Sequence, residues 1–197
     1  QLPGQDPQIL FHSMPHGVSA LDPRTGEVKW EMADLLNKRP VGSGIILNDK
    51  WVAATCGFGN GGVYMVIVAP PDGTAESKPQ LVRKLEKQVP YVPTAITRDQ
   101  LLFLWEDKGI VTCLEAETGE QVWQKRVGGT YFSSPLIAGD ALYNVSAGGE
   151  VVVLRAGKEF EELSRLELGG LSHSSPAVAN GKLFVRTYDK LYAIGAR

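Results

Sequence analysis

The sequence has few of the features that specify a metal site, a redox centre or a membrane span. Its two cysteines, Cys56 and Cys113, are neither adjacent nor part of a C-x-x-C pair. Two cysteines alone cannot build a tetrahedral zinc site, and His12, His16 and His173 stand too far apart to suggest another metal centre. No apolar run approaches 18 residues, so we predict no membrane-spanning helix. We therefore expect no bound metal and no cofactor.

The sequence also lacks a large excess of either positive or negative charge. The net charge is −2, and the lysines and arginines are scattered along the chain rather than gathered in a stripe. Nucleic-acid binding needs a basic patch, so no nucleic-acid partner is expected. The first residues, QLPGQDPQ, contain neither a charged segment nor an apolar one, and they do not have the pattern of a signal peptide.

Two remaining features could suggest chemistry, but both have simpler explanations. The segment 57–62, GFGNGG, lacks the Lys-Ser/Thr pair and the following helix of a phosphate-binding loop, so it is interpreted as a hairpin loop. Cys56 and Cys113 are expected to be buried free thiols, since cysteine is among the most buried residue types. A disulfide between them is the alternative, and it requires that their two strands abut.

The sequence contains instead a repeated turn between alternating apolar residues. Residues 20–30 are ALDPRTGEVKW, in which Asp-Pro and Gly are typical of a tight turn and the Val28/Trp30 alternation is typical of a strand. Residues 113–123, CLEAETGEQVW, repeat this pattern 93 positions later. That offset is close to twice the roughly 45-residue length of a four-stranded propeller blade.

The sequence also repeats at the length of a single blade. Residues 132–154 align with 173–194 at an offset of 41, and residues 90–114 align with 132–154 at an offset of 42. Each copy has a proline near its start (Pro93, Pro135 and Pro176) and short polar turns between apolar runs, which predicts an all-β fold of four-stranded antiparallel blades. The expected whole blades are 41–86, 90–127 and 131–168, and the expected partial blades are 8–32 and 174–195.

The repeated turn resembles the tryptophan-docking motif of PQQ-like β-propellers, a family that includes quinoprotein alcohol dehydrogenases and non-enzymatic relatives similar to BamB. The residues that carry the resemblance are Ala20, Asp22, Thr25, Gly26 and Trp30 in the first copy and Thr118, Gly119 and Trp123 in the second. The second copy departs from the motif at Cys113 and Glu115. The resemblance implies that both tryptophans are structural and pack between neighbouring blades.

The whole and partial blades together make about four blades, and the resemblance implies that this is a partial ring, since such propellers usually have about seven or eight. Residues 1–197 would then form one propeller domain or the C-terminal half of a larger propeller. A partial ring leaves strand edges open, so we expect either self-association through exposed blade edges that completes a ring or partial order at Gln1–Asp6 and at the end blades.

Three functions are compatible with this resemblance. The first is a non-catalytic, extracytoplasmic binding or scaffold module for a protein or polymer partner. The second is a fragment of a PQQ-dependent dehydrogenase that oxidises alcohols or sugars with PQQ and Ca²⁺, although the adjacent cysteines that this implies are missing. The third is the sensor domain of a larger signalling protein. The first is our prediction.

The repeat alignment also predicts a contact surface. It places Pro90, Phe132 and His173 at one equivalent position, just before the innermost strand of successive blades. Loops at this position gather around one mouth of a propeller channel. The predicted partner-binding rim therefore consists of Tyr91, Tyr131, Phe132 and His173. The alternative is that Tyr131 and Phe132 pack between blades.

Overall fold

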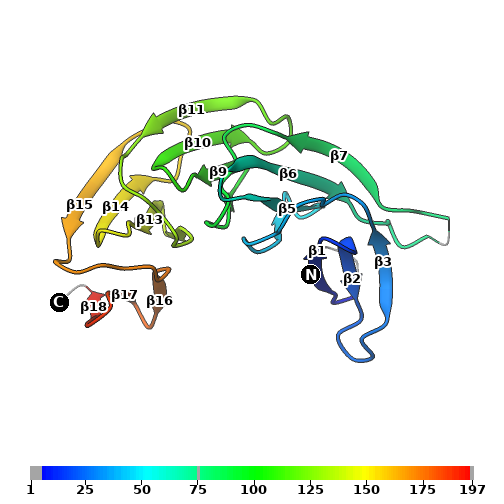
Figure 1. The fold of residues 1–197 in the computed structure, drawn as a ribbon, viewed down its shortest axis with the longest axis horizontal. Coiled ribbons are helices and arrows are strands. Elements are labelled where there is room, and N and C mark those ends of the chain that lie inside the picture. Colours follow the sequence, from blue (N-terminus) through cyan, green and yellow to red (C-terminus); the bar gives the residue numbers. More distant parts are fainter. Residues whose placement is uncertain (1–5, 75, 196–197) are drawn as a thin grey trace. The chain divides into compact units, whose positions relative to one another are not determined.

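The computed structural model describes residues 6–74 and 76–195, and its regular structure is entirely β (Figure 1). The strands form five antiparallel sheets, three of them four-stranded and two three-stranded. This confirms the predicted all-β fold with four-stranded antiparallel blades. Over the described ranges, no helix is long and apolar enough to cross a membrane. The chain divides into two compact units, Gln1–Tyr91 and Val92–Arg197.

The first unit holds one three-stranded and one four-stranded sheet, each with its strands in chain order. The three-stranded sheet consists of β1 (Ile9–Ser13), β2 (Gly17–Leu21) and β3 (Val28–Met32). The four-stranded sheet consists of β4 (Ile45–Leu47), β5 (Trp51–Phe58), β6 (Gly61–Ala69) and β7 (Gln80–Leu85).

The second unit holds two four-stranded sheets and a three-stranded one. The first sheet consists of β8 (Ile96–Arg98), β9 (Leu101–Trp105), β10 (Ile110–Glu115) and β11 (Gln121–Arg126). The second consists of β12 (Leu136–Ala138), β13 (Ala141–Val145), β14 (Glu150–Arg155) and β15 (Glu162–Glu167). The third consists of β16 (Ala177–Ala179), β17 (Lys182–Arg186) and β18 (Leu191–Gly195).

Four of the five sheets share one irregularity in strand pairing. The register shifts after Ala20 in β2, after Ile67 in β6, after Cys113 in β10 and after Val153 in β14. A bulge of this kind increases the local twist and re-aims the side chains beside it. The four pairs that precede the shift are Ala20–Trp30, Ile67–Arg83, Cys113–Trp123 and Val153–Ser164. Arg83 and Ser164 thus occupy the position that tryptophan holds in the other two sheets.

The buried side chains gather between consecutive sheets of each unit. In the first unit, one cluster joins Val18, Ala20 and Trp30 of β2 and β3 to residues of β5 and β6. In the second, the largest cluster joins β9–β11 to β13 and β14 and includes the fully buried Phe103 and Leu142. Within each unit, alternating apolar residues therefore cover the faces that consecutive sheets turn toward one another.

Loops of successive sheets in the second unit are joined by equivalent hydrogen bonds. The Thr94 N–H donates to Ser134 Oγ (3.0 Å), and the Ser134 N–H donates to Ser175 Oγ (2.8 Å). The repeated serines therefore hold the entry loops together, which is a structural role. Gly109 occupies a turn with a positive φ of 69°, and a Cβ atom there would lie 1.9 Å from the Gly128 carbonyl oxygen, so only glycine fits.

Candidate functional site

The turn of the first docking motif is held by hydrogen bonds from its own backbone. Asp22 Oδ1 accepts the N–H groups of Arg24 (2.8 Å) and Thr25 (3.2 Å), and these bonds lower the pKa of the Asp22 carboxyl. The Gly26 N–H donates to the Asp22 carbonyl (2.9 Å) from a positive φ of 75°. Asp22, Thr25 and Gly26 therefore shape the hairpin that leads into Trp30.

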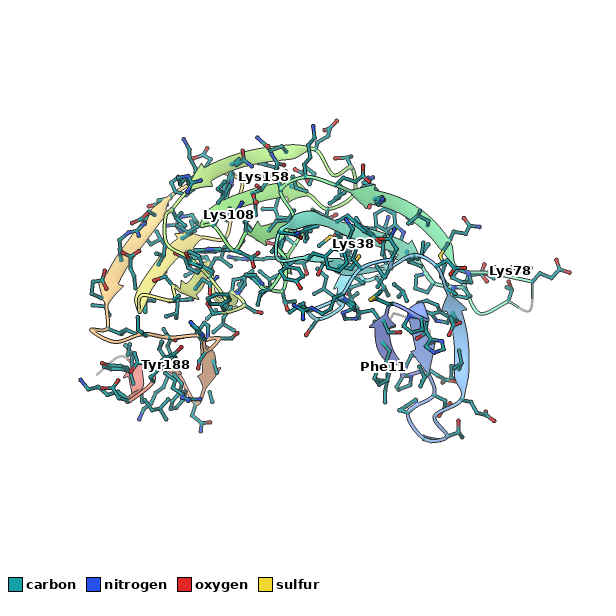
Figure 2. All side chains as sticks on the ribbon, viewed as in Figure 1. Phe11, Lys38, Lys78, Lys108, Lys158 and Tyr188 are labelled. Atoms are coloured by element: carbon teal, nitrogen blue, oxygen red, sulfur yellow. The ribbon has the colours of Figure 1, made fainter. Side chains whose placement is uncertain are left out.

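The second copy makes the same turn with a different acid. The Gly119 N–H donates to the Glu115 carbonyl (2.7 Å), and Thr118 Oγ1 accepts the Glu120 N–H (3.1 Å). The Glu115 carboxylate instead pairs with Lys158 at 2.7 Å, across to the next sheet (Lys158 is labelled in Figure 2). Replacing Asp by Glu has thus exchanged a turn contact for an ion pair between sheets.

Trp123 packs against the loop that joins β14 and β15. We call the groups that surround a tryptophan indole its dock. The Trp123 indole N–H donates to the Gly157 carbonyl oxygen (3.0 Å). The ring packs against Phe160 edge-on, with centroids 5.4 Å apart, and against Phe103 of its own sheet at 6.1 Å. The side chain is 8% exposed. Because both the polar atom and the ring have partners, this tryptophan ties two sheets together.

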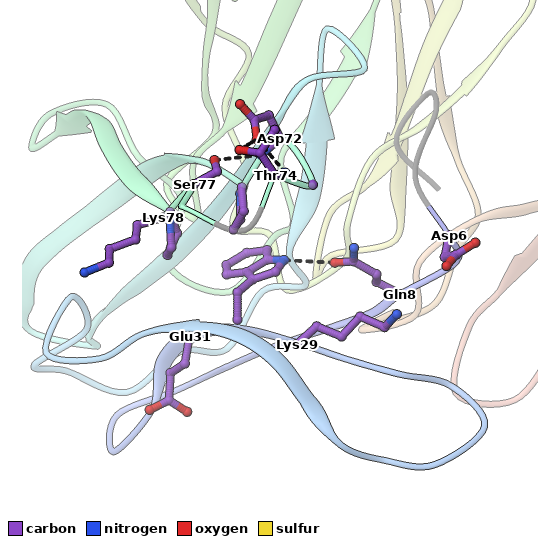
Figure 3. A pocket seen from close by; sticks show the side chains of 12 residues that line it. Asp6, Gln8, Lys29, Glu31, Asp72, Thr74, Ser77 and Lys78 are labelled. Atoms are coloured by element: carbon purple, nitrogen blue, oxygen red, sulfur yellow. Dashed lines mark hydrogen bonds between the residues drawn. The ribbon is translucent and has the colours of Figure 1, made fainter.

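Trp30 occupies the equivalent register position but has a different partner. Its indole N–H donates to Gln8 Oε1 (2.9 Å), a side chain that precedes β1, as the dashed line in Figure 3 shows. The loop facing it joins β6 and β7 and contains no aromatic residue. Trp30 is also 8% exposed, so it is buried to the same extent as Trp123.

Two members of the predicted aromatic rim are buried. Tyr131 is fully buried and lies edge-on to Trp105, with ring centroids 5.1 Å apart. Tyr91 is also buried, and Arg39 Nε donates to its hydroxyl at 2.9 Å. Neither ring can belong to an exposed surface, because packing against neighbouring strands removes more apolar area from water than display would. Tyr131 instead packs between sheets, as the alternative interpretation of the sequence expected.

The other two members of the predicted rim lie together on the surface of the second unit. Phe132 is 43% exposed and lies 4.5 Å from the His173 ring, centroid to centroid. Tyr188 completes the group. Tyr188 (labelled in Figure 2) is 60% exposed, its ring centroid is 5.5 Å from that of His173, and its hydroxyl lies 3.2 Å from His173 Nδ1. We call Phe132, His173 and Tyr188 the aromatic surface.

Tyr188 is a residue that the sequence argument missed. It lies in the turn between β17 and β18, and its N–H donates to the Leu171 carbonyl at 2.9 Å. In the preceding sheet, Ala147 makes the equivalent bond to the Thr130 carbonyl at 2.7 Å. The available signal was therefore a large aromatic residue at a turn position where the previous repeat has alanine.

The cysteines and histidines do not assemble into a reactive group. Cys56 and Cys113 are both buried free thiols, and burial raises the pKa of the Cys113 thiol to about 12. His12 Nε2 lies 2.7 Å from the Gly42 carbonyl oxygen, and His16 lies 3.0 Å from the Glu31 carboxylate. Within residues 6–74 and 76–195, no cluster of three or more histidine, cysteine or acidic side chains could hold a metal ion.

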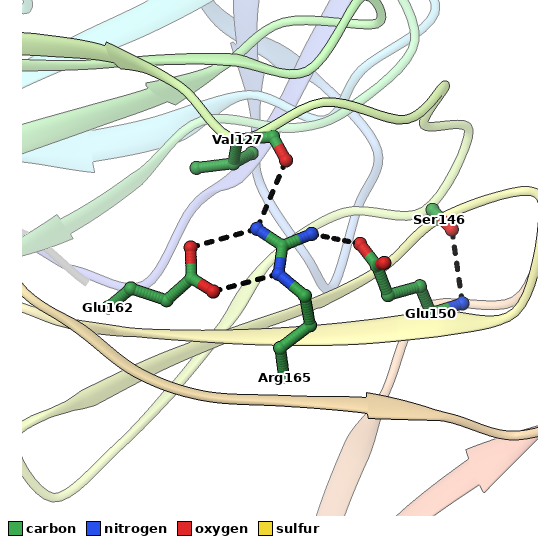
Figure 4. Close-up of polar contacts among 5 residues, drawn as sticks. All are labelled: Val127, Ser146, Glu150, Glu162 and Arg165. Carbon is green, nitrogen blue, oxygen red and sulfur yellow. Dashed lines mark hydrogen bonds and ion pairs between the residues drawn. The ribbon is translucent and has the colours of Figure 1, made fainter.

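Arg165 bridges two carboxylates and a backbone carbonyl in the second unit. In Figure 4 its guanidinium bridges Glu162 (2.8 Å), Glu150 and the Val127 carbonyl oxygen (3.1 Å). Hydrogen bonding to Glu162 raises the pKa of Arg165 further above its usual range. Because Val127 follows β11 and Arg165 lies in β15, the contact joins consecutive sheets and is structural.

The comparisons with known families agree with this repeat geometry. A family model described as "Outer membrane protein assembly factor BamB" matches residues 15–158. A search of curated proteins finds no match. The match spans both docking motifs, and the predicted PQQ-like β-propeller repeat architecture is confirmed.

One solved structure shows the same fold at low sequence identity. The crystal structure of BamB from Moraxella catarrhalis aligns with a TM-score of 0.58 and 13% identity, covering 94% of this chain and 68% of that one. A europium-containing methanol dehydrogenase aligns with a TM-score of 0.49 and 11% identity, covering 64% of this chain and 24% of that one. The alignment with BamB supports a partial propeller fold.

Proposed function

The chain belongs to the family of the outer membrane protein assembly factor BamB, and on that premise we propose that it is a non-catalytic propeller module that binds a protein partner. The observation that carries the proposal is the aromatic surface. Phe132 is 43% exposed and Tyr188 is 60% exposed, and the rings of both residues contact the His173 ring. Exposed aromatic residues with a polar tip are enriched where proteins recognise one another.

The rest of the repeat strengthens this interpretation of the aromatic surface. Tyr91 and Tyr131, on the loops that enter the earlier sheets, are buried, so an aromatic residue in such a loop can pack inward. The rings of Phe132 and Tyr188 do not pack inward and are exposed. Removing apolar area from water is worth about 25 cal/mol per Å², so displaying two rings carries a cost that a partner could recover.

The family description also supports a cellular setting. A factor for outer membrane protein assembly acts in the cell envelope, so we infer an extracytoplasmic location and a protein partner that takes part in that assembly. Several of the contacts that hold this chain together are backbone turns and apolar packing between sheets, which suits a rigid scaffold that presents loops.

Site-directed photo-crosslinking tests the proposal. Tyr188 is replaced by p-benzoylphenylalanine in the producing cell, and adducts are identified by mass spectrometry. We expect one discrete protein adduct, at least about tenfold weaker when Phe132→Ala and His173→Ala are added, because central aromatic anchors contribute about 2 kcal/mol or more each.

The matched control places the same photo-reactive residue at Phe11, which is 53% exposed on β1 in the other unit. It should not yield that adduct. An adduct at Tyr188 that persists in the folded double variant, or no discrete adduct at all, would contradict the assignment of this surface.

The opposing hypothesis, a PQQ-dependent dehydrogenase fragment, has a direct test of its own. The purified protein is incubated with PQQ and Ca²⁺, and dye-linked oxidation of an alcohol and of glucose is followed. We expect no saturable turnover. Turnover that is lost on chelation of Ca²⁺ would replace the scaffold proposal with an enzymatic one.

A further inference from the structure

The dock of Trp30 differs from that of Trp123 in what faces the indole. A cavity of about 760 Å³ lies beside Trp30, within the first unit (Figure 3). Its walls include Trp30, Lys29 and Gln8 on one side and Pro71, Ser77 and Pro79 of the β6–β7 loop on the other. This volume falls within the roughly 300–1,000 Å³ range of ligand sites.

Strand register shows which group is missing from this dock. In the second unit Leu154 pairs with Glu162, and in the first Val68 pairs with Leu81, in both cases just after the shared bulge. Phe160 stands two residues before Glu162, and Pro79 stands two residues before Leu81. Pro79 therefore occupies the position of the phenylalanine that packs edge-on against Trp123.

The two loops also differ in length. Six residues, 156–161, join β14 to β15, whereas ten residues, 70–79, join β6 to β7. The shorter loop supplies the Gly157 carbonyl and the Phe160 ring to its tryptophan. The longer loop is closed on itself, since Asp72 Oδ1 accepts from the Thr74 N–H (2.9 Å) and the Asp72 N–H donates to Ser77 Oγ (2.9 Å).

We propose that the cavity beside Trp30 binds an aromatic side chain presented by a partner polypeptide. The Trp123 dock is the template, because there an aromatic edge fills the same position against the same indole. Thr74 Oγ1 lines the cavity and donates to Asp72, and its lone pairs can accept a backbone N–H beside the inserted ring.

The identity of the partner rests on the proposed protein-binding function, but the site does not depend on the aromatic surface. The cavity belongs to the first unit, whereas Phe132, His173 and Tyr188 belong to the second. A free aromatic probe tests the cavity alone. Failure of the probe would leave the aromatic surface standing, and failure of the crosslinking at Tyr188 would leave the cavity standing.

The test uses the full chain labelled with ¹⁵N. The sequence has four tryptophans, Trp30, Trp51, Trp105 and Trp123, so four indole N–H signals are expected and Trp30→Phe assigns one of them. N-acetyl-phenylalaninamide is titrated to roughly 10 mM, since small single-contact ligands bind in the millimolar range. We expect a saturable shift of the Trp30 indole signal and little change at Trp123, whose position Phe160 fills.

Two further probes and two variants sharpen the result. N-acetyl-leucinamide should bind at least about threefold more weakly, because an aromatic edge gains about 0.5–1.5 kcal/mol against a ring beyond its area. Pro79→Phe, which supplies the missing ring from the chain itself, should abolish the shift, and Pro79→Ala should retain it.

Three results would overturn the proposal. They are no saturable shift at Trp30 in the wild-type protein, an equal response to the leucine probe, and unchanged binding in a folded Pro79→Phe variant. A Trp30 shift with N-acetylglucosamine but not with the phenylalanine probe would overturn it in favour of a polysaccharide ligand. The comparison of probes on the wild-type chain remains decisive if Pro79→Phe does not fold.

Discussion

Trp30 and Trp123 hold the same place in two sheets, and the groups around the two indoles differ. Both pair with a small residue on the preceding strand, both stand beside the same bulge, and both are 8% exposed. Trp123 meets a short loop with a carbonyl acceptor and an aromatic ring, whereas Trp30 meets a longer loop, a cavity and the side chain of Gln8. The local motif and the contacts of the indole are therefore separable: the turn and bulge are shared, but the N–H of Trp123 binds the loop of the next sheet and that of Trp30 binds a side chain that precedes its own sheet.

The largest expected effect is the loss of the filled dock. Trp123→Ala should lower the free energy of unfolding by about 3–5 kcal/mol, since it removes a well-packed indole and leaves a void. Trp30→Ala should cost about 1–2 kcal/mol less, because among the described residues no aromatic ring packs against Trp30, whereas two pack against Trp123. Urea denaturation followed by circular dichroism measures both. Equal losses would show that the two docks are energetically the same.

The next effect concerns the ring that fills the Trp123 dock. Phe160→Ala should lower the free energy of unfolding by about 1–2 kcal/mol and shift tryptophan emission to longer wavelength, because it opens the indole edge to water. The matched change in the other dock, Pro79→Ala, should leave the free energy of unfolding and the tryptophan emission nearly unchanged. A Phe160→Ala variant as stable as the wild type would mean that the ring lies against Trp123 without stabilising it.

A smaller effect appears at alkaline pH and comes from Cys113. Burial raises the pKa of this thiol from 9.0 to about 12 in the folded chain. Above pH 9 the unfolded state loses the proton and the folded state keeps it, so the stabilising contribution is complete below pH 9 and is lost as the pH rises toward 12. Stability of the wild type should fall more steeply than that of Cys113→Ala, by at most about 1.4 kcal/mol per pH unit. Parallel pH profiles would contradict the burial of the thiol.

The smallest effect belongs to the exposed turn of the first motif. Hydrogen bonds from the backbone of Arg24 and Thr25 lower the pKa of Asp22, so its stabilising contribution is present above pH 3.8 and is lost as the pH falls below that value. Asp22→Ala should lower the melting temperature slightly at pH 7 and leave it unchanged at pH 2. Asp22→Asn, which keeps the acceptor oxygen, is the control and should stay closer to the wild type at pH 7.

Much of the fold follows from the sequence, since turn chemistry and a repeat period are local signals. The spacing of Trp30 and Trp123 and the recurring Ser-Pro starts predict four-stranded antiparallel sheets, and the structure has them. What occupies the space against each indole could not be predicted, because it depends on the length of a distant loop. Nothing in the sequence marks Gln8 as the partner of Trp30, and only strand register reveals that Pro79 stands where Phe160 does.

The candidate surface shows the same division between local and tertiary signals. The repeat alignment brings Phe132 and His173 to equivalent positions, and they do lie together. Exposure was not predictable from that alignment, because Tyr91 and Tyr131 lie in similar loops and are buried. Whether such a ring turns inward depends on the volume left between two sheets, which no single repeat specifies.

Hydrogen exchange of the tryptophan indole N–H groups tests the central comparison most directly. The Trp123 N–H is bonded to a backbone carbonyl inside a filled dock, whereas the Trp30 N–H is bonded to a side chain at the edge of a cavity. Trp30 should therefore exchange at least about tenfold faster than Trp123 under native conditions, a difference of about 1.4 kcal/mol in local opening. Equal protection of the two indoles, or slower exchange at Trp30, would contradict the account.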